Sequence, residues 1–468
     1  MTWKWLLAAP FGLLLYSGGI TRVAVDPRQQ FQAIEGFGVN FTGPYFRDDQ
    51  KEMFSLLIDD LGATIFRVVP YFVYSDWETV NDNDDPNVMN WEYYNNRYSS
   101  PVFEASWTAL RYLNSRGVRP VIALMGPAPA WMLDDKASRP RHAVCGNPDQ
   151  YNGTLTHLNP AMYEEFAEEV VSMAVYARAK AHVEFRDFSP FNETDCYPTE
   201  GPRVDPGEAS RLLEVIARRM RKEGLGDVRL TVADQAVISN NYIGPILKSA
   251  ELMKQVGAFT FHTYGESSVG PQVERVKRSA YPETPIWLTE YGDLGDRDRS
   301  SGAEWKRFSL AANRRALIAL NQGANAVLYF NAFDDYEECS RRLTYHGLFT
   351  SADHVYSRRK RYYATKQLYH FVPSGSRRIG AVASTPSLVI SAFRAPDGSL
   401  IVVGVKEGGA NRIDVTLPLS ESIPPVWDLY QTTRELSCVK TGTLKVKGGH
   451  AEIDLPDEAV FTLVGPVK

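Results

Sequence analysis

The sequence predicts an α/β protein: a (β/α)8 TIM barrel with a side all-β sandwich domain. Two observations predict it. Short runs rich in β-branched and aromatic residues alternate with longer stretches of helical periodicity, and after residue 371 the long helical stretches cease. Strands that alternate with helices pair in parallel, and eight such units close into a barrel. The length of 468 residues also exceeds what one hydrophobic core usually supports.

Eight strand-like runs precede the change of pattern. They span residues 35–42, 64–70, 120–126, 184–193, 228–235, 258–265, 285–292 and 325–333. Amphipathic segments lie between them, over residues 48–61, 103–116, 161–180, 207–222, 243–256 and 303–321. Polar insertions at 81–96 and 134–159 are expected on the face where the strands end. An open doubly wound sheet is the competing architecture, but no glycine-rich phosphate fingerprint follows any strand.

The C-terminal part of the chain has a different organisation. Short alternating strands with turn signals are expected over 387–393, 400–405, 426–429 and 459–464. The segment 21–31 also has a strand pattern, and it is too short to be stable alone. We therefore expect it to pair with the C-terminal strands. The predicted domains are a barrel over 34–372 and a β-sandwich built from 373–468 together with 20–33.

The first residues have the pattern of an export signal. Lys4 supplies a positive charge, residues 5–16 form an apolar run, and residues 17–19 are small. The run is too short to span a bilayer, so no stable membrane insertion is expected. A buried N-terminal helix is the alternative, which Pro10 and Gly12 disfavour. We predict a signal peptide over 1–19 and a secreted or periplasmic protein.

Composition restricts the partners of the protein. The net charge of −5 and pI near 6.0, without a long basic run, argue against nucleic acid. Aromatic residues make up 12% of the chain, and rings outside the core could pack against sugars. Export permits disulfides among Cys145, Cys196, Cys339 and Cys438, whose pairing the sequence does not determine. No cysteine has metal-ligand spacing, and a monomer is expected.

Two of the predicted strands end in a glutamate. The fourth strand ends in Glu193 and the seventh in Glu290. Strands three apart in an eight-membered ring place their tips across the barrel mouth, where catalytic groups of such barrels lie. Two carboxyl groups facing each other across a cleft is the arrangement that glycoside hydrolysis requires. The alternative is that both are structural acids held in salt bridges.

Several segments then resemble known enzymes. Asn192-Glu193 together with Glu290 looks like the clan A retaining glycoside hydrolases. The stretches at 35–38, 127–132 and 361–379 are each similar to counterparts in glycoside hydrolase family 30, a member of that clan. The resemblance covers nearly the whole chain after residue 20. It implies a barrel with a side β-sandwich formed from both termini, which agrees with the topology inferred above.

The resemblance also implies a mechanism. Glu290 would act as the nucleophile that forms a glycosyl-enzyme, and Glu193 as the general acid/base. Asn192 would hydrogen-bond the sugar 2-OH. The mechanism needs no cofactor and no metal. The implied function is cleavage of β-glycosidic bonds in a polysaccharide or oligosaccharide with retention of configuration.

Five further residues are predicted to bind substrate or support the catalytic pair. Arg67 would keep Glu290 ionised, or else would form an ion pair in the core. His262 and Tyr264 match positions that line the family's site, with Tyr264 bonded to the nucleophile; His262 could instead be an ordinary barrel histidine. Trp131 and Tyr291 are candidates for sugar stacking, although large aromatics near strand ends often only cap the core.

The substrate is not specified by these features. The sequence departs from the family pattern at 194–196 and 329–331, near the expected sugar site. A catalytically silent carbohydrate-binding protein on the same scaffold is the second hypothesis, against which both carboxylates count. An aldolase or metal-dependent hydrolase would need a strand-end lysine or clustered histidine and aspartate ligands. Only His262 lies on a predicted strand, which disfavours that third hypothesis.

Overall fold

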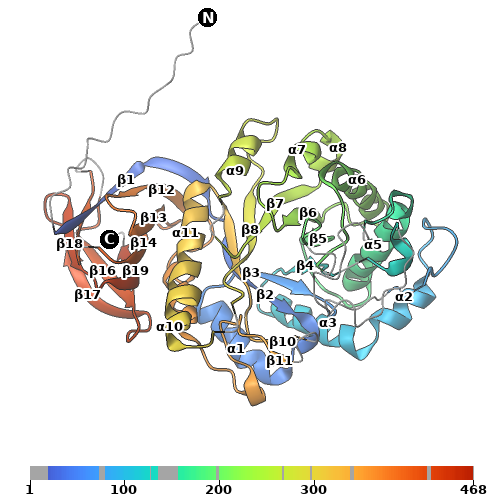
Figure 1. Cartoon of the computed structure of the whole chain (residues 1–468), viewed down its shortest axis with the longest axis horizontal. Helices are drawn as coiled ribbons and strands as arrows, with labels where there is room; N and C mark the ends of the chain where they lie inside the picture. The colour runs from blue at the N-terminus through green and yellow to red at the C-terminus, as the bar shows by residue number, and fades with distance from the viewer. Residues whose placement is uncertain are drawn as a thin grey trace, which may run out of the picture.

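The computed structural model describes residues 19–72, 78, 80–126, 128–134, 157–196, 200–265, 268–295, 298–337, 342–409, 411–418 and 423–466. Figure 1 shows two lobes side by side, with the barrel on the right and the C-terminal strands on the left. Residues 1–18, on which the predicted export signal falls, lie outside the described residues, as do Cys145 and Cys339. No helix in the described ranges is long and apolar enough to cross a membrane.

Eight parallel strands close into the predicted barrel, each paired with its neighbour in sequence and the last with the first. They are β2 (Gly36–Thr42), β3 (Ile65–Val69), β4 (Val121–Ala123), β5 (Asp187–Ser189), β6 (Arg229–Gln235), β7 (Val256–Thr263), β8 (Ile286–Tyr291) and β9 (Ala326–Tyr329). Almost every strand residue is buried, because side chains line the interior on one face and meet helices on the other. All eight predicted strands are present.

The helices surround the barrel (Figure 1). They are α1 (Lys51–Ser55), α2 (Trp91–Tyr98), α3 (Pro101–Ser115), α5 (Tyr163–Ala179), α6 (Pro206–Lys222), α7 (Ile243–Ile246), α8 (Ala250–Met253), α9 (Gly270–Lys277), α10 (Ser301–Ala303), α11 (Ala312–Gln322) and α12 (Lys360–Tyr369). The α12 helix lies in the stretch at 361–379 that resembles the last barrel helix of the family, whereas α2 and α9 were not expected. The α2 helix ends the first polar insertion and begins where the Asn90 side chain accepts from the Tyr93 amide. The α9 helix has only eight residues, too few for a clear periodic pattern.

The barrel interior has its own small core. Ile65, Val121, Trp287 and Leu328 pack together with Ala258 and Ala326. The residues that follow them in the strands, such as Leu288, instead belong to the larger core between strands and helices. This interior layer fills the barrel, so polar side chains at the strand ends are held above a packed floor.

The remaining strands form one nine-stranded sheet in the order β17-β16-β19-β14-β13-β12-β1-β15-β18. Its members are β1 (Ile20–Ala33), β12 (Arg377–Ala383), β13 (Leu388–Arg394), β14 (Leu400–Glu407), β15 (Arg412–Thr416), β16 (Val426–Thr432), β17 (Val439–Lys445), β18 (His450–Asp454) and β19 (Glu458–Gly465). Strands far apart in this order share one core, which contains Trp427 of β16 and Ile453 of β18. The sheet therefore folds over itself into the predicted sandwich.

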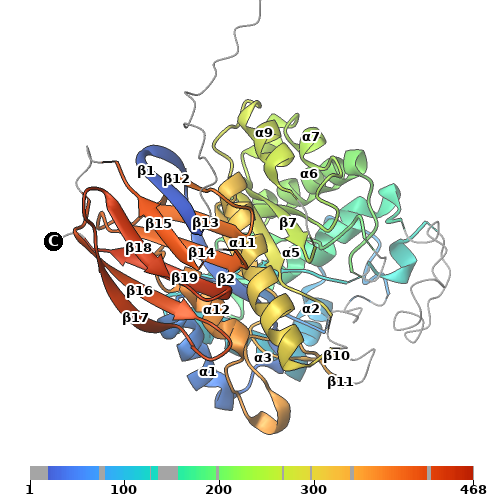
Figure 2. The same cartoon turned by 60° about the vertical axis from the view of Figure 1, so that its left-hand side comes forward.

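The N-terminal strand belongs to this sheet, as expected. Strand β1 lies between β12 and β15 (Figure 2). Its Val23 pairs antiparallel with Ala383 of β12 and parallel with Val415 of β15. The predicted domain boundaries at residues 34 and 372 fall between β1 and β2 and between α12 and β12. The sandwich packs against α11 and α12, where the Gln367 side chain donates to Thr432 at 3.0 Å.

Candidate active site

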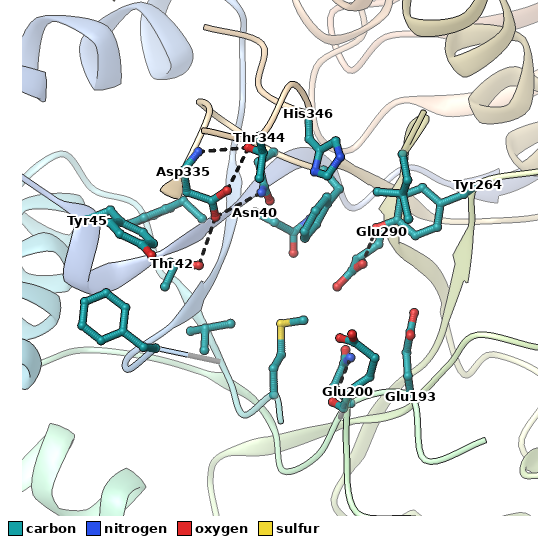
Figure 3. A pocket seen from close by; sticks show the side chains of 18 of the residues that line it. Asn40, Thr42, Tyr45, Glu193, Glu200, Tyr264, Glu290, Asp335, Thr344 and His346 are labelled. Carbon is teal, nitrogen blue, oxygen red and sulfur yellow. Dashed lines mark hydrogen bonds between the residues drawn. The ribbon is translucent and has the colours of Figure 1, made fainter. Parts of the chain in front are cut away.

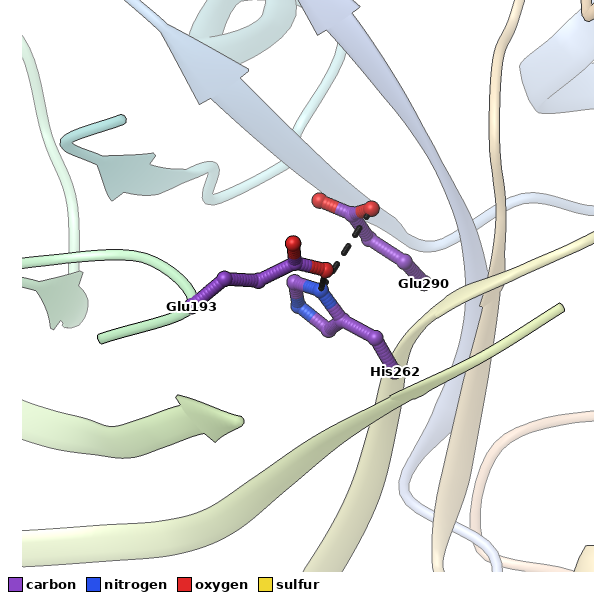
Figure 4. A group of neighbouring side chains, drawn as sticks. All are labelled: Glu193, His262 and Glu290. Carbon is purple, nitrogen blue, oxygen red and sulfur yellow. Dashed lines mark hydrogen bonds and ion pairs between the residues drawn. The ribbon is translucent and has the colours of Figure 1, made fainter. Parts of the chain in front are cut away.

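The two predicted glutamates lie together at the carboxyl ends of the barrel strands. Glu193 follows β5, Glu290 lies in β8, and His262 of β7 lies between them (Figure 4). His262 Nδ1 is 2.6 Å from Glu193 Oε1 and 3.5 Å from Glu290 Oε2. One side-chain atom of each residue lies within 4.8 Å of the others. The carboxyl groups therefore meet across a gap of a few ångströms.

Irregular backbone aims both side chains. The pairing of β8 with β9 shifts register between Leu288 and Tyr291, and such a shift redirects the side chains around it. Glu193 has a φ of +39°, in the sparsely populated left-handed region, and its amide donates to the Asp234 carbonyl at 2.9 Å. Gly201 passes so close to Asn192 that a Cβ atom there would lie 1.6 Å from the Asn192 carbonyl oxygen. These contacts fix the position of the loop that carries Glu193.

A buried arginine joins the parts of the site. Arg67 of β3 donates to Glu290 at 2.6 Å, Asn192 at 2.8 Å, Asp234 at 3.0 Å and Asn40 at 3.1 Å. Burial lowers its pKa, but the charges of Asp234 and Glu290 outweigh burial and raise it. The guanidinium is therefore permanently charged, and its two terminal nitrogens orient Glu290 and Asn192 at the same time.

Asp234 is a site residue that sequence reasoning missed. It is fully buried near the end of β6, and besides Arg67 it accepts hydrogen bonds from the hydroxyls of Ser189 and Thr289. Burial raises its pKa, but the charge of Arg67 overcomes this effect and holds the pKa well below its usual range. The signal was available, because Asp234 ends a predicted strand as the two glutamates do.

The histidine and tyrosine predicted from the family both contact the glutamates. The Tyr264 hydroxyl, just beyond β7, donates to Glu290 Oε2. Burial, and then the charge of Glu290, raises the pKa of Tyr264 well above its usual value, so it remains a donor. Burial lowers the pKa of His262, but Glu290, Asp234 and Glu193 outweigh it and raise the pKa to about 10. The acidic neighbours therefore favour the protonated form of His262.

A cavity of about 430 Å³ opens above these side chains (Figure 3). Its described lining residues are Asn40, Phe41, Thr42, Tyr45, Val69, Phe72, Met125, Asn192, Glu193, Cys196, Glu200, Ala236, Tyr264, Glu290, Leu294, Phe330, Asn331, Asp335, Tyr336, Thr344 and His346. The lining is largely apolar with a few convergent polar groups, which is typical of small-molecule sites.

Two of the predicted substrate-binding residues lie elsewhere. Tyr291 is fully buried, and its hydroxyl donates to Tyr369 of α12 at 3.1 Å. Trp131 packs partly buried against the core, and its indole nitrogen donates to the Glu78 carbonyl at 3.1 Å. Neither is among the described residues that line the cavity. Sugar stacking by these two rings therefore stays a prediction, and these contacts are those of the alternative, in which large aromatics near strand ends cap the core.

Glu193, His262 and Glu290 are also the described residues whose ligand atoms lie close enough together to hold a metal ion. A histidine ligand must be neutral to bind a metal. Because the pKa of His262 is raised to about 10, metal binding would have to displace a firmly held proton.

No family model matches the sequence. Solved structures do match. A family 30 endoxylanase from Clostridium papyrosolvens aligns with a TM-score of 0.70 and 18% identity, over 95% of this chain and all of that chain. A family 30 subfamily 8 xylanase from Clostridium acetobutylicum gives 0.69 and 16%, with the same coverage. An endo-β1,6-glucanase gives 0.66 and 16%, over 97% of this chain and 96% of that one.

The fold is that of the family 30 glycoside hydrolases. The fold resemblance predicted from sequence motifs is thereby confirmed. In this family 30 fold β5 and β8 are the fourth and seventh strands of the barrel, so Glu193 and Glu290 occupy the strand ends where the sequence placed them. The identities are low, and the likeness establishes the fold alone.

Proposed function

We propose that the protein is a retaining glycoside hydrolase that cleaves β-glycosidic bonds, with Glu290 as nucleophile and Glu193 as general acid/base. One observation carries the proposal: carboxyl oxygens of the two residues lie within 4.8 Å of each other beside the cavity. Retaining glycosidases separate their carboxyl groups by about 5–5.5 Å, whereas inverting enzymes need about 6.5–9.5 Å to admit a water molecule. The short separation favours direct attack by a carboxylate.

The surroundings of each glutamate suit its proposed role. Glu290 accepts hydrogen bonds from Arg67 and Tyr264, and both stabilise the carboxylate that attacks C1. In the first step a Glu290 oxygen bonds to C1, the bond from C1 to the leaving oxygen breaks, and Glu193 gives that oxygen its proton. In the second step Glu193 takes a proton from water, the water oxygen bonds to C1, and the ester to Glu290 breaks.

The two glutamates have different neighbours, which suits their different proposed roles. Arg67 forms ion pairs with Asp234 at 3.0 Å and with Glu290 at 2.6 Å. Glu193 instead lies beside His262, whose Nδ1 is 2.6 Å from Glu193 Oε1 and orients its carboxyl group.

The proposed substrate class is β-linked polysaccharide or oligosaccharide. The xylanases and the β1,6-glucanase with this fold act on β-linked glycans by their names, and the cavity size suits a sugar unit. Secretion, as the N-terminal sequence predicts, would give access to such polymers. The second candidate remains a carbohydrate-binding protein without turnover.

A hydrolysis screen tests this proposal. The wild-type protein is offered aryl β-glycosides together with plant and fungal polysaccharides, beside Glu193→Ala and Glu290→Ala. We expect turnover by the wild type alone, with the β-anomer formed first in proton NMR of the product. An α-anomer formed first would indicate inversion, and binding of glycans without release of reducing ends would indicate the silent protein.

A further inference from the structure

The wall of the cavity opposite the catalytic pair carries a second polar group (Figure 3). Asp335 projects a carboxylate into the cavity, where Thr344 donates to Oδ1 at 3.0 Å. Thr42, at the end of β2, and Asn331 each donate to Oδ2 at 3.4 Å. The Asp335 amide in turn donates to the Thr344 hydroxyl at 3.2 Å. The proposed catalytic mechanism uses none of these residues.

A small hairpin fixes this group. The strands β10 (Tyr336–Glu337) and β11 (Arg342–Leu343) pair antiparallel, with Tyr336 opposite Leu343. Asp335 directly precedes β10 and Thr344 directly follows β11, so the hairpin holds these two residues opposite each other. The orientation of the carboxylate is therefore fixed before a ligand binds. Because both contacts to Oδ2 are long, at 3.4 Å, this oxygen can accept shorter hydrogen bonds from hydroxyl groups of a ligand.

We propose that Asp335 is the hydroxyl-binding residue of this cavity, and that it selects an uncharged sugar and rejects a uronic acid. A carboxylate only accepts hydrogen bonds, so it can take two neighbouring sugar hydroxyls. This inference rests on the proposed function, and it names the substrate class that the catalytic pair would receive.

The charge of the cavity supports the same selection. Four carboxyl groups line it, those of Glu193, Glu200, Glu290 and Asp335, whereas no lysine or arginine is found among its described lining residues. Arg67 lies beneath the floor and is fully buried with four partners of its own. A sugar carboxylate would thus meet like charges in a cavity whose described lining offers it no lysine or arginine, which is how sites reject unwanted ligands.

Matched substrate pairs test the proposal at pH 7.5. Burial raises the pKa of Asp335 to about 6, so the residue is then mostly a carboxylate. The pairs are aryl β-glucoside with β-glucuronide, aryl β-galactoside with β-galacturonide, and xylo-oligosaccharides with and without a glucuronosyl branch. In the wild type we expect kcat/KM to favour the neutral member of the hydrolysed pair by at least about 100-fold.

Three variants examine the residue itself. We expect Asp335→Asn to lower this preference about 10- to 100-fold, since one charge-assisted acceptor is lost. Thr344→Val removes the donor to Oδ1 and the acceptor of the Asp335 amide but keeps the carboxylate, so it should lower the preference less. It keeps the test open if Asp335→Asn does not fold. Asp353→Asn changes the same charge at an exposed position and should leave the preference unchanged. Equal hydrolysis of both members by the wild type, or an unchanged preference in both cavity variants, would overturn the proposal.

Binding separates this inference from the proposed function. Calorimetry with Glu290→Gln measures the affinity for neutral and uronic xylo-, gluco- and galacto-oligosaccharides without turnover. Selective binding of a neutral sugar, lost when Asp335→Asn is added, would support the subsite. This result would hold even if the wild type hydrolyses no substrate and the proposed enzyme activity fails. Failure to bind any neutral sugar, or equal binding of the uronic acids, would refute the subsite whatever the activity.

Discussion

Arg67 and Asp234 form an ion pair in which neither side chain is exposed to solvent, with 3.0 Å between Nη2 and Oδ2. The same guanidinium reaches Glu290 and Asn192. Asp234 thus holds the cation that orients the proposed nucleophile, although it does not line the cavity. We therefore expect stability and the proposed activity to be coupled through this pair.

Replacement of Asp234 by asparagine should destabilise the fold. A buried partner left uncompensated costs about 3–5 kcal/mol at pH 7. Because folding lowers the pKa of Asp234, its stabilisation is present above the unfolded pKa near 3.8 and is lost as pH falls through the folded value. Urea denaturation at pH 7 and pH 3 should therefore show a large difference from wild type that shrinks in acid.

Asp227→Asn is the matched control, since its ion pair with Arg178 is exposed. We expect it to cost less than about 1 kcal/mol. Equal effects of the two variants at pH 7 would contradict the role given to Asp234.

Replacement of Tyr264 by phenylalanine should slow catalysis with little loss of stability. The variant loses the hydroxyl that donates to Glu290, and a hydrogen bond to a charged group is worth about 10- to 100-fold in kcat/KM. Tyr291→Phe also loses a buried tyrosine hydroxyl, but one that donates to the neutral Tyr369 rather than to a carboxylate. Steady-state kinetics should show a defect in the first variant only; equal activities would remove Tyr264 from the site.

Removal of the His262 charge should alter the pH dependence of stability. Folding raises its pKa from about 6.5 to about 10, so its charge stabilises the fold fully below pH 6.5, and this stabilisation is lost as pH rises through 10. The difference in melting temperature between wild type and His262→Gln should therefore narrow from pH 6 to pH 10. A difference that stays constant would show that the histidine is neutral.

The buried Glu168 of α5 gives a prediction about stability in which the pKa shift has the opposite sign to that of Asp234. Glu168 of α5 is fully buried, and neither carboxyl oxygen has a hydrogen-bond partner among the described residues. Burial, and then the charge of Asp82, raises its pKa to about 9. The folded state then holds a proton that the unfolded chain lacks between pH 4.5 and about 9, so the free energy of unfolding falls as pH rises through this range.

The neutral variant Glu168→Gln should avoid this loss. We expect its melting temperature to exceed that of wild type at pH 8 by on the order of 2 °C, and to match it near pH 4.5. Glu164→Gln on the same helix is exposed and should change neither value. A variant less stable than wild type at pH 8 would show that Glu168 is ionised and paired.

The sequence predicted the barrel because its strands are buried on both faces and read as apolar runs. The same reading found Glu193 and Glu290, since a carboxylate that ends such a run is conspicuous. It overlooked Asp234, which meets the same criterion. It left open whether Tyr291 stacks on a sugar or caps the core; in the structure the ring is buried, and its hydroxyl donates to Tyr369 of α12.

Contacts made by irregular segments were beyond sequence reasoning. Asp335 and Thr344 face each other only because two-residue strands pair between them, and runs so short carry no periodic signal. The left-handed backbone of Glu193 likewise depends on its bond to the Asp234 carbonyl, a contact between two strand ends. Both features required the three-dimensional structure.

Azide rescue of Glu290→Gly tests the central claim most directly. The variant should be inactive on an aryl β-glycoside that the wild type cleaves, and azide should enter the space left by the carboxylate and attack C1. We predict restored release of the phenol together with an α-glycosyl azide, whose configuration is inverted relative to the substrate. Absence of rescue, or an azide product of β-configuration, would contradict the assignment of Glu290 as the nucleophile.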